Sequence, residues 1–261
     1  AAAGIEDFAF DADFDDIIIS DLKLRELGDR AAHKHKQDTY DHTVTSVTRL
    51  AAQTQKDTHA GIIPIVIGGD HSSAIGTWSG IIPALGLEEN FGLIWIDAHM
   101  DSHTLETSNQ GKWGGWWHGM PVAALSGKGA PEFINLVNKK PKIKPEHIVL
   151  IGIRSFEPGE ADFVRDNNIK CYMAEDVAAR GFEDIYKEAL AHVKKNCDGF
   201  GVSIDLDGFD PEDAPGVGTP ENLGVRAKAA LTAFKGLGHD PDFHGLEIVE
   251  YNPHNDQDNK T

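Results

Sequence analysis

The sequence predicts an α/β fold with a central, mostly parallel sheet. Short apolar runs alternate along the chain with longer amphipathic stretches, which is the pattern of strands joined by right-handed helical crossovers. Some of the apolar runs are continuous, as in Ile62–Ile67. Such runs are typical of strands that are buried on both faces of a parallel sheet. Glycine and proline gather after several of the runs, which indicates turns at the strand ends.

Seven segments are short and rich in β-branched or apolar residues, as strands are. In chain order they are Asp16–Ser20, Ile62–Ile67, Gly92–Ile96, His147–Ile153, Lys170–Met173, Gly199–Leu206 and Phe243–Val249. Five amphipathic segments between them have helical character. They are Asp41–Gln55, Pro131–Asn138, Gly159–Asn167, Glu183–Lys195 and Arg226–Leu237. No repeat and no change in composition divides the chain, so we expect residues 1–261 to form a single domain, with further chain beyond both ends.

Composition and charge narrow the possible functions. The 261 residues contain 24 Lys and Arg against 42 Asp and Glu, a formal net charge of −18. This balance argues against nucleic acid as a partner, which would require a basic surface, and suits a small cationic substrate. The two cysteines form neither a disulfide framework nor a cysteine-rich zinc site, and we expect reduced thiols in a cytoplasmic protein. We expect no membrane partner, because no apolar run reaches the about 18 residues that a span needs.

Residue types that bind metal ions gather at three predicted strand ends. These segments are Gly68–Ser72, Asp97–Asp101 and Ser203–Pro211. Alternate residues of a strand share a face, so Asp97 lies on the same face as His99, and Asp205 lies on the same face as Asp207. In an open α/β sheet, ligands bind where the carboxyl ends of the strands meet the following loops. A single Asp-x-His pattern is usually a turn, but three such segments together predict a metal site.

The spacing of these residues favours two ions. Residues four apart on a straight strand are separated by about 13 Å. Asp97 and Asp101 therefore reach one ion only if the chain curls after His99, whereas carboxylates can bridge two ions about 3.5–4 Å apart. Four aspartates bring four negative charges, which two divalent ions would offset, and carboxylates buried without cations are costly. Carboxylate oxygens with two imidazoles favour Mn²⁺ over Zn²⁺, with Co²⁺ or Ni²⁺ as substitutes.

The three segments together resemble the signatures of the ureohydrolase family, the arginases and agmatinases, and they are most similar to those of arginases. The segments read Gly-Gly-Asp-His-Ser, Asp-Ala-His-Met-Asp and Ser-Ile-Asp-Leu-Asp-Gly-Phe-Asp-Pro. The resemblance implies a three-layer α/β/α fold, two Mn²⁺ per chain and a homotrimer or homohexamer. The ligands that it implies are His71, Asp97, Asp101 and Asp205 for one ion, and Asp97, His99, Asp205 and Asp207 for the other.

The resemblance also implies catalytic roles. A hydroxide between two divalent ions would attack a guanidinium carbon, and the tetrahedral product would collapse to urea and an amine. Asp101 would accept a proton from the attacking water, and His118 matches the proton-shuttling histidine of the family. Glu250 matches the glutamate that binds the guanidinium, whose planar N–H groups pair with a carboxylate. Thr219 matches a threonine near that glutamate, and we expect Glu247 to be a supporting or structural carboxylate.

The far end of the substrate site favours L-arginine. Arg154–Glu160 is similar to the arginase segment that contacts the α-amino group, with Glu157 at the contacting position. His103 stands where arginases usually place an asparagine for the α-carboxylate, and a cationic imidazole could make the same contact. The substrate-binding candidates are His103, Ser108, Asn109, Glu157, Thr219 and Glu250. The tryptophan-rich segment Gly111–Trp117 is longer than the corresponding arginase loop, which predicts either a folded lid or subunit contact, or an altered entry to the pocket.

Several alternatives stay open. Agmatine, guanidinobutyrate or formiminoglutamate could be the substrate of another member of the same family. A metal-binding relative without catalysis could use the site for regulation or assembly, although all six ligands, His118 and Glu250 are present. A binuclear phosphoesterase would need basic groups around the metals, whereas the motifs bring carboxylates such as Glu250.

Overall fold

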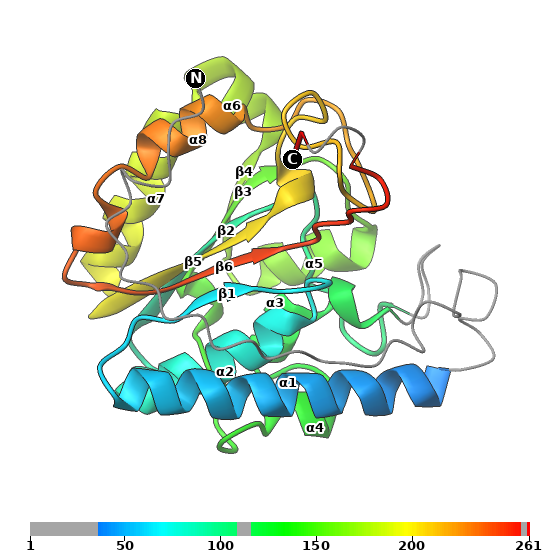
Figure 1. The fold of residues 1–261 in the computed structure, drawn as a ribbon, viewed down its shortest axis with the longest axis vertical. Helices are drawn as coiled ribbons and strands as arrows, with labels where there is room; N and C mark the ends of the chain where they lie inside the picture. Colours follow the sequence, from blue (N-terminus) through cyan, green and yellow to red (C-terminus); the bar gives the residue numbers. More distant parts are fainter. Residues whose placement is uncertain (1–35, 109–115, 257–259) are drawn as a thin grey trace.

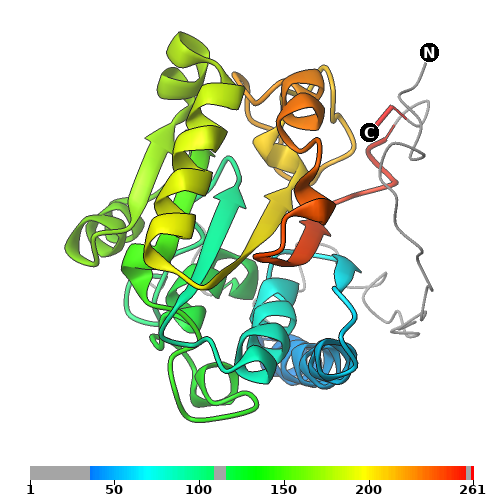
Figure 2. The same ribbon diagram turned by 90° about the vertical axis from the view of Figure 1, so that its left-hand side faces the viewer.

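The computed structural model describes residues 36–108, 116–256 and 260–261, which build one parallel sheet with helices on both faces (Figures 1 and 2). The strands are β1 (Ile65–Ile67), β2 (Phe91–Ile96), β3 (Ile148–Ile153), β4 (Lys170–Met173), β5 (Gly199–Asp205) and β6 (Phe243–Val249). They lie in the order β1-β6-β5-β2-β3-β4, and every neighbouring pair is parallel. The three-layer α/β/α fold expected from the sequence is therefore confirmed.

The helices form the two outer layers. They are α1 (Lys36–His59), α2 (Ser73–Leu85), α3 (Pro121–Leu125), α4 (Pro131–Ile134), α5 (Pro158–Asp166), α6 (Ala174–Arg180), α7 (Phe182–Asn196) and α8 (Ala227–Ala233). The side chains of α2, α3 and α5 pack on one face of the sheet, and those of α6, α7 and α8 pack on the other. Figure 1 shows α1 lying along α2, on the outer side of the layer formed by α2, α3 and α5. Within the part of the chain that the structure describes, no helix has the length and apolarity to cross a membrane.

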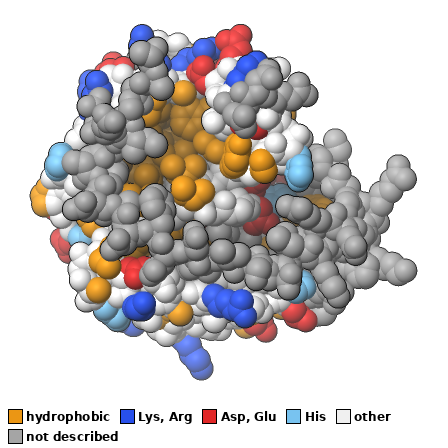
Figure 3. All heavy atoms as spheres, in the orientation of Figure 1, with side chains coloured by type: hydrophobic (Ala, Val, Ile, Leu, Met, Phe, Trp, Pro, Cys, Tyr) orange, Lys and Arg blue, Asp and Glu red, His pale blue; other side chains and the backbone are white. Residues whose placement is uncertain are grey.

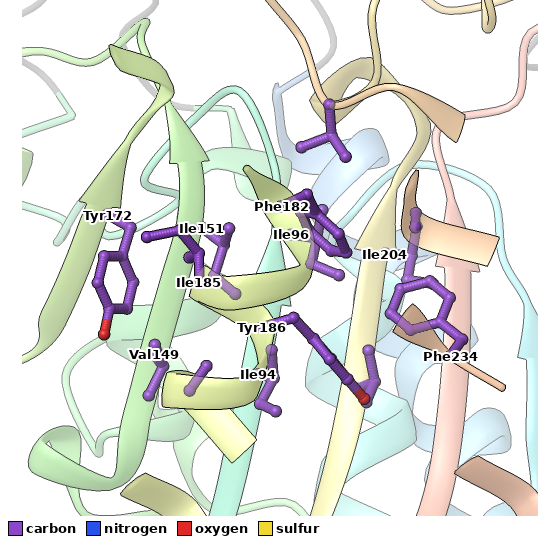
Figure 4. Close-up of a cluster of buried hydrophobic side chains, with 14 of the residues drawn as sticks. Ile94, Ile96, Val149, Ile151, Tyr172, Phe182, Ile185, Tyr186, Ile204 and Phe234 are labelled. Atoms are coloured by element: carbon purple, nitrogen blue, oxygen red, sulfur yellow. The ribbon is translucent and has the colours of Figure 1, made fainter. Parts of the chain in front are cut away.

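Helix α7 illustrates why the sequence places helices against this sheet. Its buried side chains recur every three or four residues, so they form one apolar stripe, while its charged residues face solvent. Figure 4 shows Phe182, Ile185 and Tyr186 of this stripe lying over Ile94 and Ile151 of the sheet. The cluster is closed by aromatic contacts with Phe234, which follows α8. The apolar faces of sheet and helices thus define the core.

Most predicted strands match the structure closely. Lys170–Met173 and Phe243–Val249 have the predicted bounds, and the Asp16–Ser20 segment lies outside the described residues. The expectation that Ile62–Ile67 is buried on both faces is wrong. Strand β1 begins at Ile65, and Ile67 is 70% exposed. The physical reason is its position, because within the described sheet β1 is an edge strand that pairs with β6 alone.

The predicted helices differ from the structure mainly in extent. Helix α4 is shorter than the predicted Pro131–Asn138 segment, and Val137 beyond it has a φ of 62°, which a helix does not tolerate. Helices α2, α3 and α6 were not predicted. Helix α2 is buried along nine consecutive residues and contains Pro83, so its sequence has no polar face to show a helical period.

The order of the strands reverses at the centre of the sheet. From β2 the chain adds β3 and β4 toward one edge, whereas from β5 it adds β6 toward the other edge. Neighbouring strands β2 and β5 therefore send their following loops to opposite sides. Such a switch point is where open α/β sheets bind ligands, at the carboxyl ends of the strands. The metal-binding segments after β2 and β5 flank this point.

Gly201 in β5 allows the core to close under the site. A methyl group added at Gly201 would lie 2.2 Å from the ring of Trp78, which is fully buried in α2. We expect Gly201→Ala to lower the free energy of unfolding by about 1–3 kcal/mol, because a close-packed core resists an added group. Urea denaturation measures this change.

The matched control is Gly129→Ala, since the added methyl group would lie 3.5 Å from its nearest neighbour, an ordinary contact. This variant should keep its free energy of unfolding within about 0.5 kcal/mol of the unchanged protein. Equal stability of the two variants would contradict the packing of Trp78 against Gly201.

Candidate active site

Strand register brings the predicted metal-binding segments together. Ile96 of β2 pairs with Ile204 of β5, so Asp97 and Asp205 follow at neighbouring positions. On the other side of β5, strands β6 and β1 are neighbours, so the turn that follows β1 lies next to the end of β6. The backbone N–H of His71 donates to Glu250 Oε1 at 2.9 Å. Figure 3 shows acidic and histidine side chains close together on the side of the molecule toward which β1 and β6 point.

Four predicted ligands form one compact group. Nδ1 of His71 lies 3.1 Å from a carboxylate oxygen of Asp97, 3.0 Å from one of Asp101 and 3.0 Å from one of Asp205. All four side chains are buried. These are the residues that the sequence predicted for the first ion, and their ligand atoms lie within 4.8 Å of one another.

A second group shares Asp97 with the first. Nδ1 of His99 lies 3.4 Å from the other oxygen of Asp97 and 3.3 Å from a carboxylate oxygen of Asp207. Asp205, which the sequence predicted for both ions, joins only the first group in the described residues. Its Oδ1 instead accepts the backbone N–H of Asp207 at 2.8 Å. Asp97 is therefore the carboxylate whose position connects the two groups.

The donor set fits divalent cations. Nδ1 of His71 is buried and makes no hydrogen bond, although three carboxylates surround it. Burial, with the charges of neighbouring aspartates, raises the pKa of Asp205 well above its usual value and that of Asp101 to about 7. Carboxylates crowded in this way are stable as anions only beside cations. Oxygen donors with one imidazole in each group suit a hard or borderline divalent metal ion.

Trp95 supports two of the four residues of the first group, His71 and Asp97, and the sequence analysis missed it. Its ring stacks on that of His71, with centroids 4.0 Å apart and planes 11° apart. Its Nε1–H donates to Asp97 Oδ2 at 2.9 Å. Trp95 precedes Asp97 by two residues at the end of the same strand, so the alternation of strand faces could have indicated this contact.

Arg154 fixes the loop that carries Asp207. Its guanidinium donates to the backbone carbonyls of Asp207 at 2.7 Å, Gly208 at 3.3 Å and Glu221 at 3.0 Å. Gly208 permits a close approach, because an added Cβ would lie 2.9 Å from the Cα of Asp97. The sequence contains no local signal for these contacts, since they join segments that are far apart along the chain.

Two site residues adopt backbone conformations that L-residues rarely take. Asp101 has a φ of 48° and Glu250 a φ of 65°. The left-handed turn at Asp101 curls the chain after His99, as the spacing argument required. Unfavourable backbone conformations of this kind persist where the surrounding structure enforces them, and they gather at functional sites.

The predicted catalytic side chains lie near the two groups. His118, in a 3₁₀ turn over Trp117–Gly119, is partly buried, and burial with the charges of His99 and His71 lowers its pKa. Burial, together with the charge of Asp70, raises the pKa of the Glu250 carboxyl to about 8. A partly buried carboxyl with a raised pKa binds a cation readily, because the cation stabilises the charged form.

The substrate-binding candidates divide into two places. Thr219 donates its hydroxyl to Asp207 Oδ2 at 2.7 Å, so it lies at the second metal group. His103 is further out, with Nε2 3.3 Å from both Glu157 and Glu160. Glu160, which was not predicted, is buried and belongs to the capping box of α5. An i to i+3 pair of glutamates around Pro-Gly is a helix-start pattern that could have identified it.

The remaining candidates are partly outside the described residues. Ser108 is buried, and its N–H donates to the carbonyl of Thr104 at 3.0 Å. Asn109 lies outside the described residues, as do residues 111–115 of the tryptophan-rich segment. Trp117 packs against Tyr40 and Phe133, so this end of the segment has a packing role.

Comparison with known proteins decides the family. A model of the arginase family matches residues 1–261. The chain belongs to the arginase family. It is 43% identical over 213 residues to the arginase of Bacillus caldovelox, covering 82% of this chain and 69% of that protein. It is 40% identical over 213 residues to the arginase of Bacillus subtilis strain 168, with the same coverage.

Solved structures agree with this assignment. The structure of Bacillus caldovelox arginase at pH 5.6 gives a TM-score of 0.78 at 42% identity, covering 84% of this chain and 71% of that chain. The formimidoylglutamase of Bacillus subtilis strain 168 gives a TM-score of 0.68 at 25% identity, covering 84% and 63%. The protein is therefore a hydrolase of the ureohydrolase type, and its His and Asp cluster is able to bind metal.

Because Asp97 belongs to both groups, its removal should affect two ions at once. We expect Asp97→Ala to retain less than one Mn²⁺ per chain, and Asp207→Ala to retain about one, because Asp207 belongs only to the second group. Elemental analysis after dialysis measures the metal content. Asp198→Ala, which removes an exposed aspartate paired with Asn90, should retain the full content. Two ions in Asp97→Ala would contradict the shared ligand.

Metal binding should release protons. Burial lowers the pKa of His99, but its contacts with Asp207 and Asp97 outweigh this effect and raise the pKa to about 12. The three aspartates around His71 likewise raise its pKa well above the usual value despite burial. Both shifts favour the protonated imidazoles in the metal-free protein, and only a neutral imidazole binds a metal. We expect about two or more protons released per chain, and weaker Mn²⁺ binding as pH falls.

Calorimetric titration of the metal-free protein with Mn²⁺, in buffers of different ionisation enthalpy, counts these protons. The observed enthalpy should change with the buffer. An enthalpy that is the same in every buffer would show that the histidines are already neutral.

Proposed function

We propose that the protein is an arginase that hydrolyses the guanidinium of L-arginine to urea and L-ornithine with two Mn²⁺ per chain. The observation that carries this proposal is the pair of histidine–aspartate groups joined at Asp97, beside the partly buried carboxylate of Glu250. The relatives with 43% and 40% identity are both named arginases, which supports the choice of substrate.

The metal ligands follow from the two groups. His71, Asp97, Asp101 and Asp205 would hold one ion, and Asp97, His99 and Asp207 would hold the other, with Asp205 as a second candidate bridge. When bound, a pair of divalent ions supplies Lewis-acid activation of water near neutral pH. Thr219 orients Asp207, since its hydroxyl donates to the carboxylate.

The chain's own residues would bind the guanidinium and move protons. The Glu250 carboxylate accepts hydrogen bonds from two N–H groups of the planar guanidinium. The positive charge of the bound guanidinium lowers the pKa of Glu250 toward its usual range. The Asp101 carboxylate would accept a proton from the attacking water, since a carboxylate positioned beside the reacting water can act as a general base. Burial keeps the imidazole of His118 neutral, so it can take up a proton and deliver it to the leaving amine.

The outer group of side chains, His103, Glu157 and Glu160, would hold the amino-acid end of the substrate. Glu157 and Glu160 supply negative charge for the α-ammonium group, and His103 supplies a donor for the α-carboxylate. Ser108 and Asn109 are further candidates for the carboxylate. Three ionisable side chains meet here, since Nε2 of His103 lies 3.3 Å from a carboxylate oxygen of each glutamate. This region would therefore distinguish substrates with an α-amino-acid end from substrates without one.

A second candidate is hydrolysis of a guanidine or amidine without the complete α-amino-acid end of L-arginine: agmatine, which lacks the α-carboxylate, or guanidinobutyrate or formiminoglutamate, which lack a free α-amino group. The observation that favours the last two is His103, which already contacts both glutamates that an α-ammonium group would need. A metal-binding relative without catalysis is disfavoured, because Glu250 contacts the backbone of His71 and the charges of His71 and His99 act on His118.

Two further proposals concern the whole protein. We propose that it works in the cytoplasm, which its two free cysteines favour, and that it assembles as a homotrimer or homohexamer, as the family resemblance implies. Light scattering on the purified protein measures the assembly. A monomer at micromolar concentration would contradict it.

The experiment that tests the function is urea release by the Mn²⁺-loaded protein, with L-arginine, agmatine and formiminoglutamate compared side by side; for the last, formamide replaces urea as the measured product. We expect turnover of L-arginine to exceed that of the others. Turnover of agmatine alone would support the proposed metal chemistry, but it would overturn the assignment of His103, Glu157 and Glu160 to the amino-acid end of the substrate. No turnover of any substrate, with two metal ions bound, would overturn the enzymatic proposal.

Glu250→Gln tests the guanidinium contact. Loss of one partner of a buried charge pair should lower kcat/KM for L-arginine by about 100-fold or more, while both metal ions are retained. Steady-state kinetics with elemental analysis measures both properties. The control is Glu212→Gln, an exposed position paired with Arg226. Unchanged kinetics in Glu250→Gln would mean that another group holds the guanidinium.

A further inference from the structure

Glu247 is a buried carboxylate that takes no part in the chemistry described above. It lies in the middle of β6 and is fully buried. Among the ion pairs of the described residues, none joins Glu247 to a lysine or arginine. Burial raises its pKa, which reflects the cost of holding a charge there. A residue of this kind needs an explanation in terms of what it contacts.

Its contacts are hydroxyl groups, all of which can donate. Glu247 Oε1 accepts from Thr77 Oγ1 at 2.6 Å, and Oε2 accepts from Ser203 Oγ at 3.0 Å. Ser73 Oγ lies 3.3 Å from Oε1, but its proton is shared with the closer carbonyl of Asp70. Thr77 on α2 therefore fixes one oxygen, and the other oxygen is turned toward Ser203.

Ser203 connects Glu247 to a metal ligand. The two residues are direct partners in the register of β5 and β6. Ser203 Oγ also lies 3.0 Å from Nε2 of His71, and all three side chains are buried. Glu247, Ser203 and His71 therefore form a chain of hydrogen bonds. The chain reaches Nε2 of His71, and the other ring nitrogen, Nδ1, faces the aspartates of the first metal group.

The chemistry of these groups determines which atom donates the proton in each of these hydrogen bonds. An ionised carboxylate only accepts hydrogen bonds, so the single hydroxyl proton of Ser203 is donated to Glu247. The oxygen of Ser203 is then left as an acceptor, and Nε2 of His71 must carry a proton to bond with it. In a neutral imidazole that leaves the lone pair on Nδ1, which is the form that binds a metal ion.

We propose that Glu247 is a positioning residue for metal binding, which acts through Ser203 to hold His71 in the tautomer whose Nδ1 faces the ion. This inference rests on the metal-binding role proposed above for His71. The stacking of Trp95 sets the plane of the ring, and Glu247 sets which nitrogen carries the proton. The two constraints together leave His71 one orientation and one protonation pattern for ligation.

A glutamine at this position separates the proposal from a packing role. Glutamine has nearly the same shape, but with Thr77 donating to its oxygen, its amide NH₂ would face Ser203 and donate. Ser203 would then donate to Nε2 of His71, and the proton would move to Nδ1, inside the metal site. Glu247→Gln should therefore weaken metal binding although it fills the same space.

The test is calorimetric titration of metal-free protein with Mn²⁺, for the unchanged chain, Glu247→Gln, Ser203→Ala and the double variant. We expect Glu247→Gln to weaken the first metal site by about 10- to 100-fold, the range for residues that orient a metal ligand, with the second site retained. If Glu247 acts through Ser203, the double variant should lose no more affinity than Ser203→Ala. Ser79→Ala is the control, a buried hydroxyl on the same helix α2 that has no hydrogen-bond partner among the described residues.

Full affinity in Glu247→Gln, or losses that simply add in the double variant, would overturn the positioning role. Failure of the unchanged protein to bind Mn²⁺ at all would overturn the metal-binding proposal as well, so the two failures are distinguishable. If Glu247→Gln does not fold, nitrogen-15 NMR of histidine-labelled, Zn²⁺-loaded unchanged protein decides. A proton on Nε2 of His71 is expected, and an Nε2 without a proton would overturn the proposal.

Discussion

The rest of this structure depends on the convergence of four buried or nearly buried aspartates at the centre of a parallel sheet. Asp97, Asp101, Asp205 and Asp207 meet at the carboxyl ends of β2 and β5, where the strand order reverses. Like charges in a buried site oppose folding unless cations offset them. The fold supplies a rigid frame against this repulsion, with Trp95 on one aspartate, backbone N–H groups on others and a left-handed turn at Asp101. A site held in this way is prepared for divalent ions.

Most strands could be predicted from the sequence because each is a short apolar run between turn residues, and the predicted bounds of the described strands agree with the structure to within one residue except at β1, which begins at Ile65. The helices were harder to predict where tertiary burial hides their period. Helix α2 is buried along most of its length, so its sequence has no polar stripe. The exposure of Ile67 could not be predicted either, because a continuous apolar run does not reveal whether its strand lies at the centre or the edge of a sheet. Position in the sheet is a property of the whole topology.

The grouping of the candidate metal ligands could be predicted because alternation along a strand and the position of the strand end both act locally. His71, Asp97, Asp101 and Asp205 were identified on these grounds together with the family resemblance, and they lie within ligand distance of one another. The second bridging position of Asp205 is not visible in the structure. The supporting residues were missed where their contacts cross the fold. Arg154 reaches carbonyls more than 50 residues away in the chain, which no local pattern encodes.

The central claim is that these side chains form a binuclear metal site. Crystals grown with Mn²⁺ and measured near the manganese absorption edge test it most directly, because anomalous scattering locates each ion independently of any activity. Two peaks are predicted, one beside Nδ1 of His71 and one beside Nδ1 of His99, with Asp97 between them. A single peak, or peaks away from these two histidines, would contradict the account.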